Sequence, residues 1–155
     1  MNTSDLCDEN DSALVLPVPL IRYGGVRLLD GRIETARTGD ANQVIREVLA
    51  GPGENRILVV AGGGTAARYA LVGDRLAARA LEQGWQGIVV DGLVRDTDAL
   101  ADMPIGVWAR GTWPRRGPVD GPGEVGVPVT LEDVTLRSGD RVVCDADGVV
   151  VMQTS

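Results

Sequence analysis

The sequence predicts one α/β domain with a mixed sheet, a parallel βαβ centre and antiparallel C-terminal strands. Two apolar runs, Ile57–Ala61 and Ile88–Val90, lie about thirty residues apart with an amphipathic helix between them, as a βαβ unit requires. Beyond Gly111 the chain changes to short valine-rich runs separated by proline and glycine, which is typical of antiparallel strands. No linker divides residues 1–155, so we expect a single domain.

The first forty residues predict peripheral elements. Residues 1–12 are polar and acidic, and they form either a flexible tail or the start of a first helix. Leu14–Leu20 is apolar but contains two prolines, which favours a covering segment over a central strand. Short strands are expected at Val26–Leu29 and Gly31–Ala36, separated by a turn at Asp30-Gly31.

A helix is predicted from Asp40 to Ala50. Asp40 can cap it with Gln43 three residues later, and Gly51 and the proline after it end it. The apolar residues that share one face of this helix are Val44, Ile45, Val48 and Leu49.

The middle of the chain predicts the centre of the sheet. Ile57–Ala61 is a continuous apolar run, which indicates a strand buried on both faces. A helix follows from Asp74 to Gln83, and a second buried strand covers Ile88–Val90 before a turn at Asp91-Gly92. The elements expected after that turn are a short helix at Thr97–Asp102 and a third strand at Ile105–Ala109.

The C-terminal third predicts antiparallel strands. They are expected at Val125–Leu131 and Val134–Leu136, and in a hairpin that pairs Arg141–Cys144 with Val149–Met152. Asp147-Gly148 is the turn of that hairpin.

Composition excludes several classes of function. The formal net charge of -7 opposes direct binding to nucleic acid, and no apolar run is long enough to span a membrane. The chain has no histidine, so catalysis must rest on carboxylates, arginine, backbone amides or a metal. Cys7 and Cys144 fit no metal or redox motif; reduced cytoplasmic thiols are expected, and a disulfide is the alternative.

Two short motifs could carry chemistry. Gly73-Asp74-Arg75-Leu76 opens a predicted helix, whose first amides can bind a carboxylate, although Asp74 could simply cap the helix. Arg95-Asp96 follows a buried strand, where ligands gather in open α/β sheets. Arg95 could clamp a carboxylate and Asp96 could hold a hard cation, or the pair could be a surface charge and a helix cap.

Other candidates have simpler explanations. Gly62–Gly64 fits neither dinucleotide nor phosphate-loop spacing and predicts a tight turn. A hairpin turn accounts for Asp145 and Asp147. The basic residues Arg110, Arg115 and Arg116 indicate either a solvated loop or a contact with an anion or a partner. Packing accounts for Trp85, Trp108 and Trp113.

Over residues 57–152 these segments form an ordered series of motifs. They are Gly62-Gly63-Gly64-Thr65, Gly73-Asp74-Arg75-Leu76-Ala77, Gly84-Trp85-Gln86-Gly87-Ile88-Val89-Val90, Val94-Arg95-Asp96, Gly106-Val107-Trp108-Ala109, Pro114-Arg115, Val127-Pro128-Val129, Gly139-Asp140 and Asp147-Gly148-Val149-Val150. Together they resemble the regulator of ribonuclease activity A family, which also contains the 4-hydroxy-4-methyl-2-oxoglutarate aldolases. The sequence departs from that family's pattern at Trp113, where many relatives carry histidine, and across residues 36–42.

The resemblance implies a swivelling β/β/α sandwich, assembled as a homotrimer or a hexamer. It implies that Gly73, Asp74, Arg75, Leu76 and Arg95 hold substrate and that Asp96 holds Mg²⁺ or Mn²⁺. Arg95, Asp96 and Asp74 would then be the catalytic residues, with Asp74 orienting metal-bound water.

The function implied is a class II, metal-dependent lyase in the cytoplasm. Its substrates would be short 2-oxo acids, through aldol cleavage of 4-hydroxy-4-methyl-2-oxoglutarate to pyruvate and decarboxylation of oxaloacetate. The alternative is a non-catalytic regulator that binds and inhibits ribonuclease E. Neither function requires contact with nucleic acid or a membrane.

Overall fold

The computed structural model describes residues 1–154. Its helices are α1 (Thr3–Glu9), α2 (Gln43–Leu49), α3 (Asp74–Glu82) and α4 (Thr97–Ala101), with a single 3-10 turn, η1, at Gly64–Ala66. Its strands are β1 (Leu14–Val15), β2 (Ile21–Arg22), β3 (Leu29–Thr38), β4 (Ile57–Ala61), β5 (Ala70–Val72), β6 (Gly87–Val94), β7 (Gly106–Thr112), β8 (Gly123–Val125), β9 (Val129–Leu131), β10 (Val134–Leu136), β11 (Arg141–Asp145) and β12 (Gly148–Met152). None of the helices in residues 1–154 is long and apolar enough to cross a membrane.

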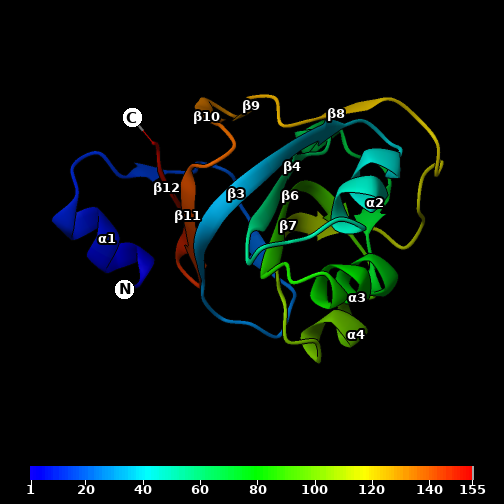
Figure 1. The fold of residues 1–155 in the computed structure, drawn as a ribbon, viewed down its shortest axis with the longest axis horizontal. Helices are drawn as coiled ribbons and strands as arrows, with labels where there is room; N and C mark the ends of the chain where they lie inside the picture. Colours follow the sequence, from blue (N-terminus) through cyan, green and yellow to red (C-terminus); the bar gives the residue numbers. More distant parts are fainter. Residues whose placement is uncertain (155) are drawn as a thin grey trace.

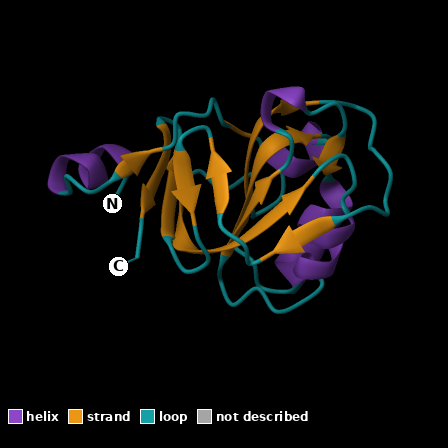
Figure 2. Ribbon diagram, turned by 90° about the horizontal axis from the view of Figure 1, so that it is seen from above, coloured by secondary structure: helices purple, strands orange, loops and turns teal. Residues whose placement is uncertain are grey.

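Two sheets lie face to face between helices (Figures 1 and 2). The central sheet contains β3, β4, β6 and β7 in parallel, with β2 antiparallel at its edge. Strand β5 adds in parallel to the end of β6, and β8 adds antiparallel to the end of β3. Strands β9 and β10 form a separate antiparallel pair. The outer sheet consists of β1, β12, β11 and the first residues of β3, all antiparallel. Helices α2, α3 and α4 cover the free face of the central sheet, and α1 lies against the outer sheet. The expected β/β/α sandwich is confirmed, with α1 as an additional layer.

Strand β3 belongs to both sheets. Its residues 29–32 pair with β11, and its residues 33–37 pair with β4. The predicted turn at Asp30-Gly31 is therefore wrong, because both residues lie inside this strand. A Cβ at Gly31 would lie 2.2 Å from Nε2 of Gln86, so a larger residue there would require the Gln86 side chain to move. Tertiary pairing thus overrides the local turn signal.

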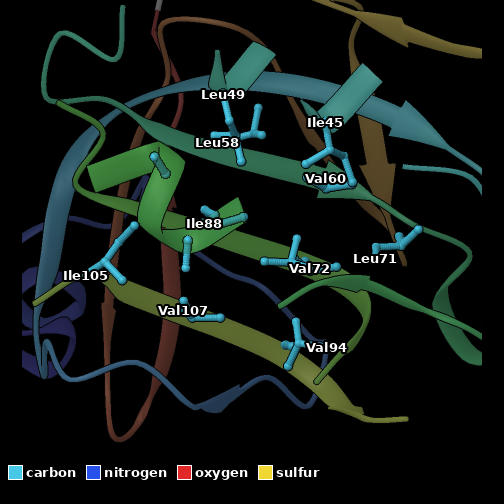
Figure 3. Packing of buried hydrophobic residues seen from close by; sticks show 14 of the residues in the cluster. Ile45, Leu49, Leu58, Val60, Leu71, Val72, Ile88, Val94, Ile105 and Val107 are labelled. Atoms are coloured by element: carbon cyan, nitrogen blue, oxygen red, sulfur yellow. The ribbon is translucent and has the colours of Figure 1, made fainter. Parts of the chain in front are cut away.

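The apolar runs alternate between two cores. In β4, Leu58 and Val60 face the helices, whereas Ile57 and Val59 face the outer sheet. In the helix-side core, the strand residues that face the helices pack against apolar side chains of α2, α3 and α4, such as Ile45 of α2 (Figure 3). The prediction that Ile57–Ala61 is buried on both faces is confirmed.

Helix α1 covers the outer face of the outer sheet. Leu6 packs there against Val143 and Val150. The N–H and hydroxyl of Thr3 both donate to the carboxylate of Asp145, at 2.8 Å each. The first residues of the chain therefore contain a docked helix.

Three predicted boundaries are wrong. Helix α2 begins at Gln43, because the Thr38 hydroxyl donates to the Ala41 carbonyl at 2.6 Å and residues 38–42 turn before the helix; Asp40 is not its cap. The predicted turn at Asp91-Gly92 lies inside β6, which continues because β5 and β7 pair with its last residues. The predicted strand Val125–Leu131 is two strands, separated where Gly126 adopts a positive φ of 77°.

Strand β5 was not anticipated. It pairs with β6 at Leu93 and Val94, beyond the point where β4 ends at Ala61 opposite Asp91. It leads directly into Gly73 and α3. This short strand therefore brings the start of α3 beside the carboxyl end of β6.

Candidate functional site

A pocket of about 720 Å³ opens where α2, β5, the start of α3 and the end of β6 converge. Its lining includes all six residues singled out from the sequence, which are Gly73, Asp74, Arg75, Leu76, Arg95 and Asp96. The residues that complete it are Asn42, Arg46, Ala70, Leu71, Val72, Arg79, Arg116 and Val119. The two motifs therefore share one cavity.

Asp96 joins the two motifs directly. Its Oδ2 accepts a hydrogen bond of 3.0 Å from the backbone N–H of Asp74, the first residue of α3. The carboxylate thus caps α3 and not α4, the helix that Asp96 itself precedes. Its backbone is left-handed, with φ 62° and ψ 41°, a conformation that Asp and Asn tolerate better than most residues. The expectation that Asp74 could be the cap of α3 is wrong, because Gly73 holds that position.

Gly73 allows this close approach. A Cβ at this position would lie 2.4 Å from Oδ2 of Asp96 and 3.3 Å from Cγ of Arg95. Only a residue without a side chain leaves Asp96 in its observed place.

The start of α3 offers backbone donors to the pocket. The first bond that closes the helix runs from the N–H of Ala77 to the carbonyl of Gly73. Among the described residues, the N–H groups of Arg75 and Leu76 have no acceptor, as expected in the first turn of a helix. These amides and the helix dipole favour a bound anion.

Arg95 is held by its backbone and has no acidic partner. Its N–H donates to the Val72 carbonyl at 3.0 Å, and its Nη1 donates to the Pro114 carbonyl at 3.4 Å. No carboxylate among residues 1–154 forms a salt bridge with it. Its remaining donors can therefore bind a ligand carboxylate.

The pocket is cationic although the chain is acidic. Five arginines line it, against two aspartates, whereas the whole chain has a net charge of -7. A cleft lined by one sign of charge concentrates ligands of the opposite sign. This pocket therefore favours anionic ligands.

The sequence did not single out Arg46 and Arg79, and it left the role of Arg116 open. Arg79 follows Arg75 by four residues, so its position on the same helix face was readable from the spacing. Arg46 and Arg116 come from separate elements, and only the tertiary fold brings them to α3.

Arg110 lies in a different environment from Arg115 and Arg116, so the predicted basic cluster does not form. Its side chain is largely buried and forms ion pairs with Asp91 of β6 and with Glu132 in the turn between β9 and β10, the latter at 2.9 Å. Burial alone would lower the pKa of Arg110, but its two carboxylate partners raise it above the ordinary value. Arg110, Asp91 and Glu132 thus form a structural network of two ion pairs.

The remaining candidates have structural roles or lie at the surface. Asp145 binds Thr3, and the buried Trp108 donates from Nε1 to the Asp145 carbonyl at 3.2 Å. Trp113 is 45% exposed, so the packing role expected for it is wrong. Both cysteines are free, and burial raises the pKa of Cys144, so this thiol remains protonated.

The pocket suits a divalent cation only if water and substrate supply most of its ligands. Within residues 1–154, no group of three or more Asp, Glu, Cys or His side chains gathers to hold a metal. Oδ1 of Asp96 accepts no hydrogen bond from these residues, so it is available to a cation. One or two carboxylates completed by water and substrate oxygens are a common Mg²⁺ arrangement.

The composition excludes one class of aldolase chemistry. All fifteen basic residues are arginines, so the chain has no lysine to form a Schiff base with a carbonyl substrate. Carbonyl chemistry in this pocket must use arginine, backbone amides, carboxylates or a metal.

Comparisons with known proteins find relatives over nearly the whole chain. A family model described as RraA-like, aldolase/RraA, matches residues 3–151. A protein of Aromatoleum aromaticum is 42% identical over 99% of this chain and 96% of its own length, and one of Laribacter hongkongensis is 45% identical over 96% and 93%. Both bear the name "Putative 4-hydroxy-4-methyl-2-oxoglutarate aldolase".

Solved structures carry other names. The RNA-processing inhibitor RraA from Thermus thermophilus has a TM-score of 0.93 and 38% identity, over 98% of this chain and 92% of its own. A structure described as an S-adenosylmethionine:2-dimethylmenaquinone methyltransferase, from Geobacillus kaustophilus, also has a TM-score of 0.93, with 40% identity over 100% of this chain and 96% of its own. The relatives named above therefore carry three different functional names.

Proposed function

Because the chain belongs to the RraA-like family, we propose that it is a divalent-metal-dependent lyase that cleaves carbon–carbon bonds in short 2-oxo acids. Its reactions would be aldol cleavage of 4-hydroxy-4-methyl-2-oxoglutarate to pyruvate and decarboxylation of oxaloacetate. The observation that carries the proposal is the meeting of Arg95, Asp96 and the first amides of α3 in one cationic pocket. The aldolase names of the relatives support the same reaction.

The proposed roles follow from the donors in the pocket. The guanidinium of Arg95 and the N–H groups of Arg75 and Leu76 would bind the carboxylate next to the 2-oxo group and fix its orientation. The exposed carboxylate of Asp74 would orient a water molecule at the reacting centre. In the cleavage, the C4 hydroxyl would give its proton to this water, and the C3–C4 bond would break. Its electron pair would form the pyruvate enolate, while C4 would become the carbonyl carbon of a second pyruvate. Protonation of the enolate at C3 would release the first pyruvate.

Asp96 would hold the cation, with the substrate and water completing its coordination. The chemistry that Mg²⁺ or Mn²⁺ supplies when bound is Lewis-acid stabilisation of the negative charge that develops on the 2-oxo oxygen. Since Asp96 also caps α3, it would keep the substrate-binding amides in a fixed position relative to the cation.

The same pocket argues against methyl transfer. A methyltransferase that uses S-adenosylmethionine must bind a sulfonium cation and an adenine ring. Among the described residues, no aromatic side chain lines this pocket to stack with an adenine ring. The methyltransferase name of one structural relative therefore has no support in the pocket's chemistry.

A coupled pyruvate assay tests the proposal. Pyruvate release from 4-hydroxy-4-methyl-2-oxoglutarate and from oxaloacetate should require Mg²⁺ or Mn²⁺ and stop with EDTA. Asp96→Asn keeps a residue that tolerates the left-handed backbone but removes the charge, and it should lower kcat/KM by about 100-fold or more. Full activity in EDTA or in Asp96→Asn would contradict the assigned metal role.

A second function is supported by the structural relative described as an RNA-processing inhibitor. In this alternative the protein is a non-catalytic regulator that binds and inhibits ribonuclease E through protein contacts, and its acidic charge disfavours RNA itself. Inhibition of purified ribonuclease E, without pyruvate release from either substrate, would favour this alternative.

We also propose that the protein assembles as a homotrimer, or as a hexamer of two trimers. Light scattering coupled to size-exclusion chromatography measures the assembly directly. A monomeric mass at micromolar concentration would contradict it.

A further inference from the structure

Three arginines in the pocket have no role in the proposed chemistry at Asp96. Arg79 and Arg116 form no salt bridge and donate no hydrogen bond to the described residues, and Arg46 has only a 3.6 Å contact with Asp120, whose side chain is 91% exposed. Among the described residues, four arginines without a carboxylate partner line this one pocket: Arg75, Arg79, Arg95 and Arg116.

Their positions separate them from the Asp96 end of the cavity. Arg116 forms a β-bridge with Ala70, at the start of β5, whereas Arg95 bonds to Val72 at its end. Two residues of strand correspond to about 6–7 Å. Arg79 lies one helical turn beyond Arg75. Arg46 belongs to α2, which packs beside α3, and its side chain lines the same pocket.

This separation matches a ligand with two negative groups. A ligand carboxylate that accepts hydrogen bonds from Arg95 and from the first amides of α3 satisfies the donors at one end of the pocket. The charges of Arg79 and Arg116 then remain unpaired among the described residues, and Arg46 is paired only with the exposed Asp120. A five-carbon 2-oxo dicarboxylate can bridge the two ends, so its second carboxylate would reach these arginines.

We propose that Arg46, Arg79 and Arg116 form a second anion subsite that binds the distal carboxylate of the substrate. The subsite makes the pocket selective for 2-oxo dicarboxylates over 2-oxo monocarboxylates. This inference rests on the proposed lyase function, because it assumes that the 2-oxo carboxylate binds at Arg95.

Calorimetric binding separates the subsite from catalysis. With Mg²⁺ present, 2-oxoglutarate should bind about 10- to 100-fold more tightly than pyruvate, as a charge-assisted carboxylate contact provides. Equal affinities for the two acids would overturn the subsite while leaving the 2-oxo acid site in place. No binding of either acid would overturn the subsite and the proposed function together.

Variants assign the selectivity to the named residues. We expect 2-oxoglutarate binding to weaken by about tenfold or more, and pyruvate binding to stay unchanged, in three variants. They are Arg79→Gln, Arg116→Gln and the triple variant that combines both with Arg46→Gln. Arg137→Gln is the matched control, because it removes the same charge from an exposed arginine outside the pocket. Retained selectivity in the triple variant would overturn the assignment.

Kinetics with matched substrates provides a second measurement. 4-Hydroxy-4-methyl-2-oxopentanoate has the same reacting centre as 4-hydroxy-4-methyl-2-oxoglutarate but lacks the distal carboxylate. Arg79→Gln should lower kcat/KM for the dicarboxylate by about tenfold and not for the monocarboxylate. An equal loss with both substrates would overturn a role in specificity. Arg46 and Arg79 lie in the last turns of α2 and α3, where positive charge also stabilises the helix. The unfolding temperatures of the variants and the wild type are therefore compared, to separate a loss of stability from a loss of binding.

Discussion

Asp96 combines an uncommon backbone conformation with two side-chain functions. Its left-handed φ directs the carboxylate back toward α3, where Oδ2 caps the helix and Oδ1 accepts no hydrogen bond from residues 1–154. Strained residues of this kind are frequent at functional sites. The sequence indicated that Asp96 was a candidate, but it could not show that this residue caps the preceding helix, because that contact joins positions 22 residues apart.

Gly73 is the residue whose substitution best tests this arrangement. In Gly73→Ala the new Cβ would collide with Oδ2 of Asp96, so the carboxylate must move. A displacement of about 1 Å at a reacting centre can cost about 100-fold in rate, and we expect a loss of that order in kcat/KM. The unfolding free energy should change by only about 1 kcal/mol, the usual effect of a cap substitution.

Gly39→Ala is the control for this substitution. No atom lies within 4 Å of a Cβ at Gly39, and its φ lies outside the left-handed range. This variant should retain full activity. Wild-type kcat/KM in Gly73→Ala would show that the position of Asp96 is unimportant for turnover.

The helices and strands differ in how well local sequence predicts them. Apolar patterns in the sequence locate β4, β6, β7 and the C-terminal hairpin. A continuous apolar run marks a strand that is buried on both faces, and an alternating run marks a strand that is buried on one face. Strand β5 has no such signal: it has three residues, and it forms only because β6 extends past β4. The Asp91-Gly92 pair resembles a turn, but the buried ion pair with Arg110 satisfies Asp91 within the strand.

Helix α1 is held to the outer sheet by a carboxylate. Burial opposes the ionisation of Asp145, but hydrogen bonds from Thr3, Asp147 and Gly148 lower its pKa below the ordinary value. Since the folded-state pKa is depressed, this stabilisation is complete above the unfolded value of about 3.9 and is lost as pH falls through the folded-state pKa. The docking of α1 should therefore weaken only below about pH 4.

Nuclear magnetic resonance can follow this titration. The Thr3 amide resonance should shift with a midpoint below the ordinary pKa of a carboxyl group. In Asp145→Asn, which cannot ionise, the acid transition of this amide should disappear. A wild-type midpoint at or above the ordinary value would contradict the prediction.

At the scale of the whole molecule, charge and composition act together. An acidic surface surrounds a cationic pocket, so anions are attracted specifically to that cavity. The sequence provides the net charge, but the five arginines come from α2, α3, the end of β6 and the segment after β7. Only the assembled fold shows that they line one pocket.

The absence of lysine makes a prediction for the whole chain. Sodium borohydride added with pyruvate should neither inactivate the protein nor attach a reduced pyruvyl group to any side chain, because no ε-amino group can form the imine. Intact mass spectrometry measures the adduct, and a lysine-dependent aldolase serves as the positive control. A covalent adduct on an internal residue, accompanied by loss of activity, would contradict a metal-dependent mechanism.

The pairing of β3 with β8 has a consequence for engineering. Every residue that lines the pocket lies between positions 42 and 119, and Thr38 and Gly123, which flank this stretch, face each other in the sheet. Residues 39–122 thus leave and re-enter the fold at adjacent points. A chimaera that exchanges this cassette between relatives would transfer the complete ligand cavity through two neighbouring junctions and leave the outer sheet and α1 in their parental form.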